Sequence, residues 1–299
     1  VIYHRADKSV DVALVRAPWL KDTVIHASTA LAFQTPAGTR LTGWITLPST
    51  PKVTPPPLLI YCQGGLWDGD APGFSREAQV LADLGIAVDP DVDRLVLVCE
   101  DGSMFGEEYT LVAVADYVLG RRKGDTVSNL SSSRALKDVT EKHGGRYHPS
   151  AVGEVNVVKK MKEVNAVIGG EGNGGIIVPD LHYGRDALAG IALFLTFLAR
   201  SGKSVKQIRN SYPDYFISKN KIELQQGADL DGIFDRIRIK YKGQPANTVD
   251  GLRIEFDSDW VHLRASNTEP IVRIIAESRF ETMANNIALK LMQDIKELQ

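Results

Sequence analysis

The chain has 299 residues, of which 43% are hydrophobic and 24% charged, a composition typical of a globular protein of about two ordinary domains. Its 35 basic and 37 acidic residues leave a formal net charge of −2 without a long run of either sign, which argues against a nucleic-acid binder or an electrostatic membrane ligand. The two cysteines, Cys62 and Cys99, are too few for a disulfide framework or a thiolate metal site. No long uncharged apolar stretch and no signal-peptide pattern occurs, so we expect a protein of the reducing cytoplasm, with no membrane partner.

The first 56 residues alternate short stretches typical of β-strands. Segments 30–34 and 39–47 flank Pro36-Ala-Gly38 and predict a hairpin. Residues 48–57 are proline-rich and predict an exposed extended link. A strand at 58–62, a glycine-rich loop, a helix at 76–84 and a strand from Ile86 then predict a βαβ unit, which requires parallel strands.

Further along the chain, the alternation of strands and helices continues. Strands are predicted at 126–130, 166–168 and 175–178, and helices near 106–120, 132–143, 153–164 and 185–201. The last helix has an apolar face predicted from Leu188, Ile191, Leu195 and Leu198, and Gly202 is placed to end it in a left-handed conformation. This pattern predicts an α/β fold of parallel mixed sheets with helices on both faces.

After residue 218 the pattern changes to short strands grouped with two helices. The strands are predicted at 221–224, 252–256, 260–264 and 270–276, and the helices near 228–241 and 280–298. This mixture predicts a small α+β C-terminal domain with an antiparallel sheet.

The motif Asp89-Pro-Asp-Val-Asp-Arg94 directly follows a predicted strand. In an extended segment Asp89, Asp91 and Asp93 project to the same side, where their like charges repel. A hard divalent cation, Mg²⁺ before Ca²⁺, would hold the three carboxylates together. The spacing alone leaves a solvated acidic turn open as the alternative.

The motif Gly169-Gly-Glu-Gly-Asn-Gly-Gly175 follows the predicted strand at 166–168. Its glycines allow the backbone to approach a ligand, while Glu171 and Asn173 offer the acceptors and donors that sugar hydroxyls need. A tight turn that only links two strands is the alternative. A nucleotide-binding loop fits poorly, because the segment leads into another strand and not into a helix.

The motif Arg264-Ala-Ser-Asn-Thr-Glu-Pro270, followed by Arg273, concentrates hydrogen-bond donors suited to a phosphate. The side-chain donors are Arg264, Ser266, Asn267, Thr268 and Arg273. A hairpin with exposed polar residues is the alternative. Together the three motifs indicate a phosphorylated sugar as the ligand.

In their residues and their order along the chain, the three motifs resemble the metal, sugar and phosphate loops of the α-D-phosphohexomutases, the phosphoglucosamine mutase and phosphomannomutase group. The resemblance covers residues 82–299 and is specific. It implies that Asp89, Asp91 and Asp93 of the Asp89–Arg94 loop hold Mg²⁺, that Glu171 and Asn173 bind sugar hydroxyls, and that the five donors of the third motif hold the non-reacting phosphate. The ligand would be a hexose or aminohexose phosphate. The family reaction is an intramolecular phosphoryl transfer between sugar O1 and O6.

The same resemblance divides the chain into four parts. Residues 57–122 would be part of a second mutase domain with the βαβ unit and the metal loop, 123–218 a third domain with the sugar loop, and 219–299 a fourth, phosphate-binding domain. Residues 1–56 form a β-rich segment. Residues 1–85 as a whole resemble an N-terminal piece of a prolyl-oligopeptidase-like α/β-hydrolase, with Gln63-Gly-Gly65 where His-Gly-Gly is usual and no nucleophile elbow after it.

The nucleophile implied by the resemblance is a phosphoserine in a Ser-His-Asn-Pro loop, and the 299 residues contain no such loop. The cluster Ser131-Ser-Ser133 has no histidine beside it in the sequence and predicts an N-cap for the helix at 132–143. We therefore expect a phosphohexomutase-like isomerase whose catalysis is impaired, unless a separate chain supplies the missing domain. A non-catalytic sugar-phosphate binding module and a non-functional chimera are the alternatives, so the sequence leaves open whether the protein is an enzyme.

Overall fold

The computed structural model describes residues 86–89, 91–224, 229–266 and 269–298, together with the backbone of five short strands before residue 86. The chain divides into two compact units, Val1–Pro56 with Asp68–Asp83, and Pro57–Trp67 with Leu84–Gln299. In the described part of the chain, no helix is long and apolar enough to cross a membrane.

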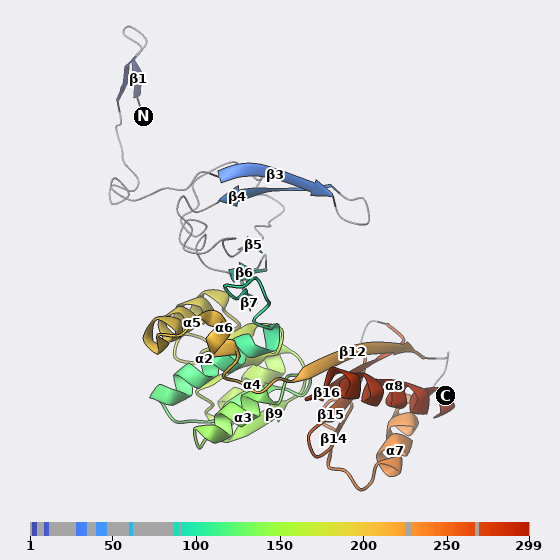
Figure 1. The fold of residues 1–299 in the computed structure, drawn as a ribbon. Helices are drawn as coiled ribbons and strands as arrows, with labels where there is room; N and C mark the ends of the chain where they lie inside the picture. The colour runs from blue at the N-terminus through green and yellow to red at the C-terminus, as the bar shows by residue number, and fades with distance from the viewer. Residues whose placement is uncertain are drawn as a thin grey trace. The chain divides into compact units, whose positions relative to one another are not determined.

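The first unit contains two antiparallel strand pairs (Figure 1). Strand β1 (Ile2–His4) pairs with β2 (Ser9–Asp11), and β3 (Ser28–Gln34) pairs with β4 (Arg40–Thr46). The second pair confirms the predicted hairpin. The proline-rich link and the predicted helix at 76–84 lie outside the described residues.

The second unit begins with a three-stranded sheet. Strand β5 (Ile60–Tyr61) runs parallel to β6 (Ile86–Val88), as the βαβ prediction required, and β6 pairs antiparallel with β7 (Leu95–Leu97). Cys99, just after β7, is buried as a free thiol, whereas Cys62 lies outside the described residues. The acidic motif connects β6 to β7.

A four-stranded sheet follows, in the order β11-β10-β8-β9. Three of its strands are parallel, β8 (Thr126–Asn129), β9 (Tyr147–Ser150) and β10 (Ile168–Glu171), and β11 (Gly175–Ile177) is antiparallel to β10. Asn129 and Glu171 therefore end neighbouring parallel strands at the same edge of the sheet. This is the edge at which open α/β sheets bind ligands.

Helices cover both faces of this sheet, which confirms the predicted fold class. Their bounds are α2 Glu107–Arg121, α3 Ala135–Lys142, α4 Glu154–Val164, α5 Ala187–Ser201 and α6 Val205–Arg209. The successive residues Gly169 and Gly170 of β10 show the two faces, since Gly169 lies against Met161 of α4 and Gly170 against Leu111 of α2. We refer to β8–β11 and these helices as the α/β domain.

The buried face of α5 differs from the prediction. Leu188 is 58% exposed, whereas Ala187, Gly190 and Phe194 are buried. A Cβ atom at Gly190 would lie only 2.7 Å from the Ile176 side chain, so the small residues let the helix approach β11 closely. The prediction is confirmed for Ile191, which is buried, and was wrong for Leu188, because it weighed the large apolar residues alone. Gly202 ends the helix with φ 63°, as predicted.

The C-terminal domain is a five-stranded antiparallel sheet with two helices, in the strand order β12-β16-β15-β14-β13. Its strands are β12 Phe216–Glu223, β13 Ala246–Asn247, β14 Leu252–Glu255, β15 Trp260–Ala265 and β16 Ile271–Ser278, and its helices are α7 Leu230–Lys240 and α8 Glu281–Leu298. The small α+β domain is confirmed.

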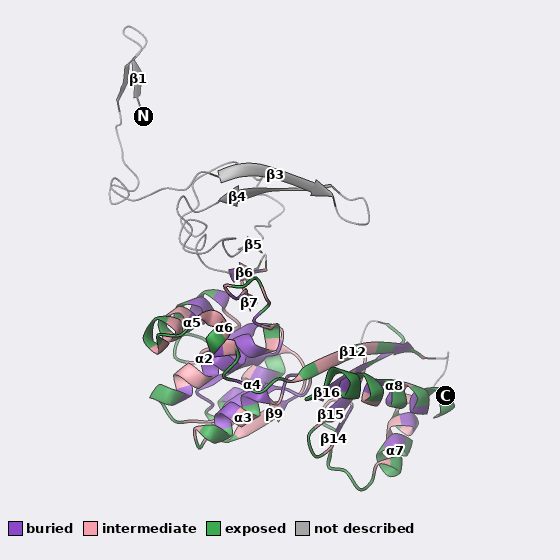
Figure 2. Cartoon of the chain, viewed as in Figure 1, coloured by how far each residue is buried: buried purple, intermediate pink, exposed green. Residues whose placement is uncertain are grey.

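The two faces of this sheet differ in chemistry. Alternate residues such as Leu263 and Ile274 pack with Ile237 of α7 and Leu291 of α8 in one apolar core. Figure 2 shows both buried and exposed stretches along α7 and α8. The opposite face is polar and includes His262 and Glu277, both fully buried. That polar face contacts the α/β domain.

Candidate functional site

The acidic motif forms a tight turn that brings its three carboxylates together. One ligand oxygen from each of Asp89, Asp91 and Asp93 lies within 4.8 Å of the others. The turn is closed by a hydrogen bond from the Val92 N–H to the Asp89 carbonyl at 3.0 Å, and Val92 adopts a left-handed φ of 57°. Asp89 Oδ1 also accepts the N–H groups of Asp93 at 3.1 Å and Arg94 at 3.0 Å.

The carboxylates of this turn crowd one another. Burial opposes the ionisation of Asp89, but hydrogen bonds from the Arg94 N–H, Asp93 and the Arg94 side chain lower its pKa to about 2. Burial and the hydrogen bond to Asp89 raise the pKa of Asp93, against the opposing charge of Arg185. Asp91 is exposed and has no hydrogen-bond partner among the described residues. Three convergent carboxylates with an open member fit a hard divalent cation.

The acidic turn is fixed to the glycine-rich loop by the backbone. The Leu95 N–H donates to the Gly174 carbonyl at 3.0 Å, and Arg94 and Gly175 form an antiparallel bridge. Gly174 has a φ of +87°, and a Cβ there would stand 2.3 Å from the Leu95 carbonyl oxygen. Only glycine permits this approach without strain.

Arg185, immediately before α5, connects the two loops through its side chain. Its Nη1 lies 2.9 Å from Glu171 Oε2, its Nη2 contacts Asp93, and its Nε lies 3.4 Å from Glu154. The sequence had indicated Arg185 only as part of a helix start. In the sequence Arg185 is one charged residue among others after both motifs, so no local pattern identified its role.

Both carboxylate oxygens of Glu171 have hydrogen-bond or ion-pair partners, and the residue is 5% exposed. Its Oε1 accepts the Asn129 side-chain amide at 2.8 Å and the Gly153 N–H at 3.1 Å. Asn173 is half-buried, and its Oδ1 accepts the Gly175 N–H at 3.1 Å, which shapes the turn. Among the described residues, the Asn173 amide nitrogen donates to no group.

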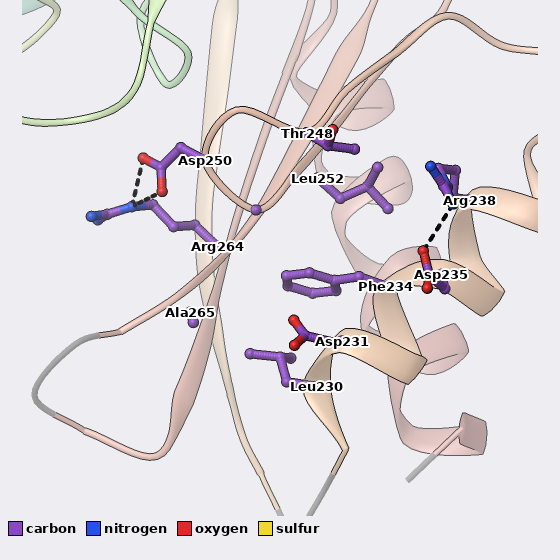
Figure 3. A pocket seen from close by; sticks show the side chains of 11 residues that line it. Leu230, Asp231, Phe234, Asp235, Arg238, Thr248, Asp250, Leu252, Arg264 and Ala265 are labelled. Atoms are coloured by element: carbon purple, nitrogen blue, oxygen red, sulfur yellow. Dashed lines mark hydrogen bonds and ion pairs between the residues drawn. The ribbon is translucent and has the colours of Figure 1, made fainter. Parts of the chain in front are cut away.

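Arg264 of the third motif is oriented by Asp250. Its Nε lies 3.0 Å and 2.9 Å from the two carboxylate oxygens, and the guanidinium points toward Asp250 and away from Phe234 (Figure 3). The pocket beside them has a volume of about 440 Å³. The Ser266 N–H donates to the Ile271 carbonyl at 2.9 Å and closes the base of the loop. Asn267 and Thr268 lie outside the described residues.

Asp250 also joins the C-terminal domain to the α/β domain. Its Oδ2 accepts the Val152 N–H at 2.8 Å, and the next residue, Gly153, donates to Glu171. A continuous polar path therefore runs from Arg264 through Asp250, the Val152–Gly153 backbone and Glu171 to Arg185, and from there to Asp93. The sequence motifs gave no sign of Asp250.

The serine cluster has a histidine beside it in space. Ser131 Oγ lies 2.9 Å from His262 Nδ1, and His262 Nε2 donates to the Asp250 carbonyl at 2.6 Å. Burial lowers the pKa of His262 to about 4, so its ring is neutral at pH 7. The predicted cap is present at Ser133: α3 is bounded at Ala135, but Arg134 before it is already helical, and the Ser133 hydroxyl accepts the Ala135 N–H at 3.2 Å.

Two acidic side chains lie behind the glycine-rich loop, Glu277 fully buried and Glu108 partly buried. The Glu277 carboxylate accepts the Trp260 indole N–H at 2.6 Å and the Arg134 N–H at 3.1 Å. The Glu108 carboxylate occupies the space that a side chain at Gly172 would fill and accepts the Ser133 N–H at 2.9 Å. Burial raises the pKa of Glu108 to about 8.

Comparison with known families assigns most of the second unit. Residues 106–215 match the α/β/α domain III of the phosphoglucomutase/phosphomannomutase family, and residues 220–293 match its C-terminal domain. The two matches follow each other in the family order and together span more than half of the chain. This part of the chain belongs to the phosphohexomutase family.

Curated relatives agree with this assignment. The phosphoglucomutase/phosphomannomutase of Thermococcus kodakarensis is 34% identical over 229 residues, which cover 74% of this chain and 50% of that protein. The phosphoglucosamine/phosphogalactosamine mutase of Sulfurisphaera tokodaii is 32% identical over 219 residues, 72% of this chain and 48% of that protein. The chain thus spans about half the length of the curated relatives it matches.

Solved structures share the fold. A phosphoglucomutase/phosphomannomutase family protein from Burkholderia thailandensis matches with a TM-score of 0.62 and 27% identity, over 72% of this chain and 46% of that chain. The N-acetylphosphoglucosamine mutase of Aspergillus fumigatus, solved in complex with GlcNAc-6P and magnesium, matches with a TM-score of 0.53 at 16% identity, over 75% of this chain and 54% of that chain. At that identity the second likeness concerns the fold alone.

Proposed function

We propose that the phosphohexomutase part of this chain binds Mg²⁺ and a hexose or aminohexose phosphate. The observation that carries the proposal is the polar path from Arg264 through Glu171 to Asp93, which joins the three predicted loops. Residues that would bind an ion, a sugar and a phosphate are thus parts of one connected network. The names of the curated relatives, a phosphoglucomutase/phosphomannomutase and a phosphoglucosamine/phosphogalactosamine mutase, support the same ligand class.

In this proposal Asp89, Asp91 and Asp93 hold the cation. When bound, Mg²⁺ would stabilise negative charge on a transferring phosphoryl group. Arg185 keeps Asp93 and Glu171 at fixed positions, so that the metal loop and the sugar loop keep their spacing. Arg94 neutralises part of the charge on Asp89, with Nε and Oδ2 2.5 Å apart.

Glu171 and Asn173 would bind sugar hydroxyls, and the donors around Arg264 would hold the phosphate that does not react. The described members of the phosphate set are Arg264, Ser266 and Arg273. Asp250 fixes the Arg264 guanidinium through two hydrogen bonds, which reduces the conformational entropy lost when an anion binds.

The family reaction moves a phosphoryl group between sugar O1 and O6 by way of a phosphoserine. Because the 299 residues contain no Ser-His-Asn-Pro loop, we propose that these residues alone interconvert sugar phosphates poorly, and that a separate polypeptide carrying the serine would restore turnover. Glucosamine 6-phosphate, Mg²⁺ and a catalytic amount of the 1,6-bisphosphate provide the assay. Efficient interconversion by this chain alone would contradict the proposal.

Calorimetric titration with glucosamine 6-phosphate in the presence of Mg²⁺ tests binding directly. Arg264→Ala should weaken binding on the order of a hundredfold, because a charge-assisted contact is lost. The control Arg236→Ala changes an exposed arginine of α7 and should leave binding unchanged. Equal affinity of the two variants would show that the phosphate binds elsewhere.

A non-catalytic sugar-phosphate binding module is the second candidate, favoured by the missing serine loop. In that case the phosphate contacts alone would carry affinity. Binding that survives Asp91→Ala but is lost with Arg264→Ala would identify such a module, whereas loss in both variants supports a metal-assisted site.

A further inference from the structure

Three basic side chains form one row across the polar face of the C-terminal sheet. In the strand register, Arg273 of β16 lies directly opposite Arg264 of β15 on one side and Lys221 of β12 on the other. Directly paired residues of an antiparallel sheet project to the same face with Cβ atoms about 4.5–5.5 Å apart. The row lies one residue pair from the β15–β16 loop that contains the phosphate motif.

The row carries uncompensated charge. Arg264 is paired with Asp250, but Lys221 and Arg273 are exposed and have no ion-pair partner among the described residues. Like charges placed directly opposite each other destabilise a sheet. The three cations of the row and the Asp250 carboxylate that pairs with one of them sum to a net charge of +2, which equals in magnitude the charge of a phosphate monoester dianion. Glu223 lies outside the row, opposite Ile271.

A second lysine on the same face, Lys219, has its charge neutralised by an acidic partner. Lys219 lies two residues earlier on β12, opposite Ile275, and its Nζ is 2.7 Å from Glu107. Among the residues that the structure describes, Lys221 has no such acid, although it is next to Arg273. On β12, Lys219 outside the row therefore has an acidic partner, whereas Lys221 inside the row has none among the described residues.

We propose that Lys221 is a third phosphate-binding cation, which selects the dianionic form of the sugar phosphate. The inference rests on the proposed function, because it places the phosphate at the loop between β15 and β16. Arg264 and Arg273 give the site hydrogen-bond geometry, and Lys221 adds the charge that matches the second negative charge of the phosphate.

The test compares a dianion with a fixed monoanion of the same shape. Calorimetric titrations at pH 8 use glucose 6-phosphate and glucose 6-sulfate on the wild type, Lys221→Gln and the control Lys296→Gln, an exposed lysine of α8. Lys221→Gln should weaken glucose 6-phosphate binding about tenfold and glucose 6-sulfate binding less, while Lys296→Gln binds both ligands like the wild type. Thermal unfolding of each variant verifies that the fold is intact.

Equal glucose 6-phosphate affinities of Lys221→Gln and Lys296→Gln would overturn the inference, as would an equal loss for both ligands. Arg264→Ala distinguishes a wrong role for Lys221 from a wrong position of the phosphate site. If this variant loses the phosphate while Lys221→Gln does not, only the role of Lys221 is wrong. If Arg264→Ala binds like the wild type, the phosphate site itself is misplaced.

Discussion

Arg185 and Glu171 form an ion pair of 2.9 Å in which only 19% and 6% of the respective side chains are exposed. The same guanidinium contacts Asp93, so one cation serves two acidic loops. Burial of this kind makes the loss of one partner costly, because the remaining carboxylates lose their counterion while still shielded from water.

Arg185→Met should therefore lower the free energy of unfolding by about 3 kcal/mol. Urea denaturation measures the change. Arg122→Met is the matched control, since its pair with Asp180 is 58% and 70% exposed and should contribute about 0–1 kcal/mol. Similar losses for the two variants would contradict the central position of Arg185.

Asp91→Asn should weaken Mg²⁺ binding on the order of tenfold, because it removes one charge from the carboxylate set. Its exposed position predicts a change in unfolding free energy within about 0.5 kcal/mol. Titration with MgCl₂ alone measures the affinity, and Asp257→Asn, an exposed acid of the C-terminal domain, is the control. Unaltered Mg²⁺ affinity in Asp91→Asn would rule out this residue as a ligand.

Gly174→Ala tests the backbone connection between the acidic turn at 89–94 and the glycine-rich loop. Gly174 and Gly102 have similar positive φ angles, +87° and +82°, but a Cβ at Gly174 meets the Leu95 carbonyl at 2.3 Å and a Cβ at Gly102 meets nothing within 4 Å. Both alanine variants should lose about 1 kcal/mol from the backbone conformation. Gly174→Ala should lose about 2 kcal/mol more from the clash and weaken Mg²⁺ binding as well. Equal stability of the two variants, measured by urea denaturation, would contradict this contact.

Glu108 predicts a pH dependence of stability. Its pKa is raised from 4.5 to about 8, mainly by burial, so the folded state holds a proton that the unfolded state releases. The stabilisation is complete below pH 4.5 and is lost as the pH rises through about 8. Glu108→Gln keeps a neutral side chain and should lack this loss, so its stability relative to the wild type should increase between pH 5 and pH 9.

Urea denaturation of both proteins across that range measures the difference. Groups present in both, such as His262, whose pKa is lowered to about 4, cancel in the comparison. Parallel pH profiles of the two proteins would show that Glu108 is ionised in the folded state at neutral pH.

Local sequence patterns predicted most helices and the two sheet types, because apolar periodicity and glycine positions act within a few residues. The α5 helix and its end at Gly202 are examples. The same patterns missed β9, whose four residues include Pro149 and little apolar character, and α6, which has only five residues. Short elements such as these depend on tertiary packing rather than on propensity.

The candidate site was predicted in part for a similar reason. The three motifs named Asp93, Glu171 and Arg264 as candidates, but not the residues that connect them. Arg185 and Asp250 act through partners up to 98 residues away in the sequence, as the Asp250 contact with Val152 shows. Without such partners in view, each is an ordinary charged residue beside a glycine. The assignments of individual ligand residues therefore stay predictions until binding is measured.

Val92 separates two of the three aspartates and is a β-branched residue held in the left-handed region, a conformation that costs about 1–2 kcal/mol. The free energy of folding compensates this strain, and hydrogen bonds to Asp89 maintain the turn. The ion would then bind to a preorganised site. Its association should therefore be fast, and little free energy would be needed to reorganise the backbone.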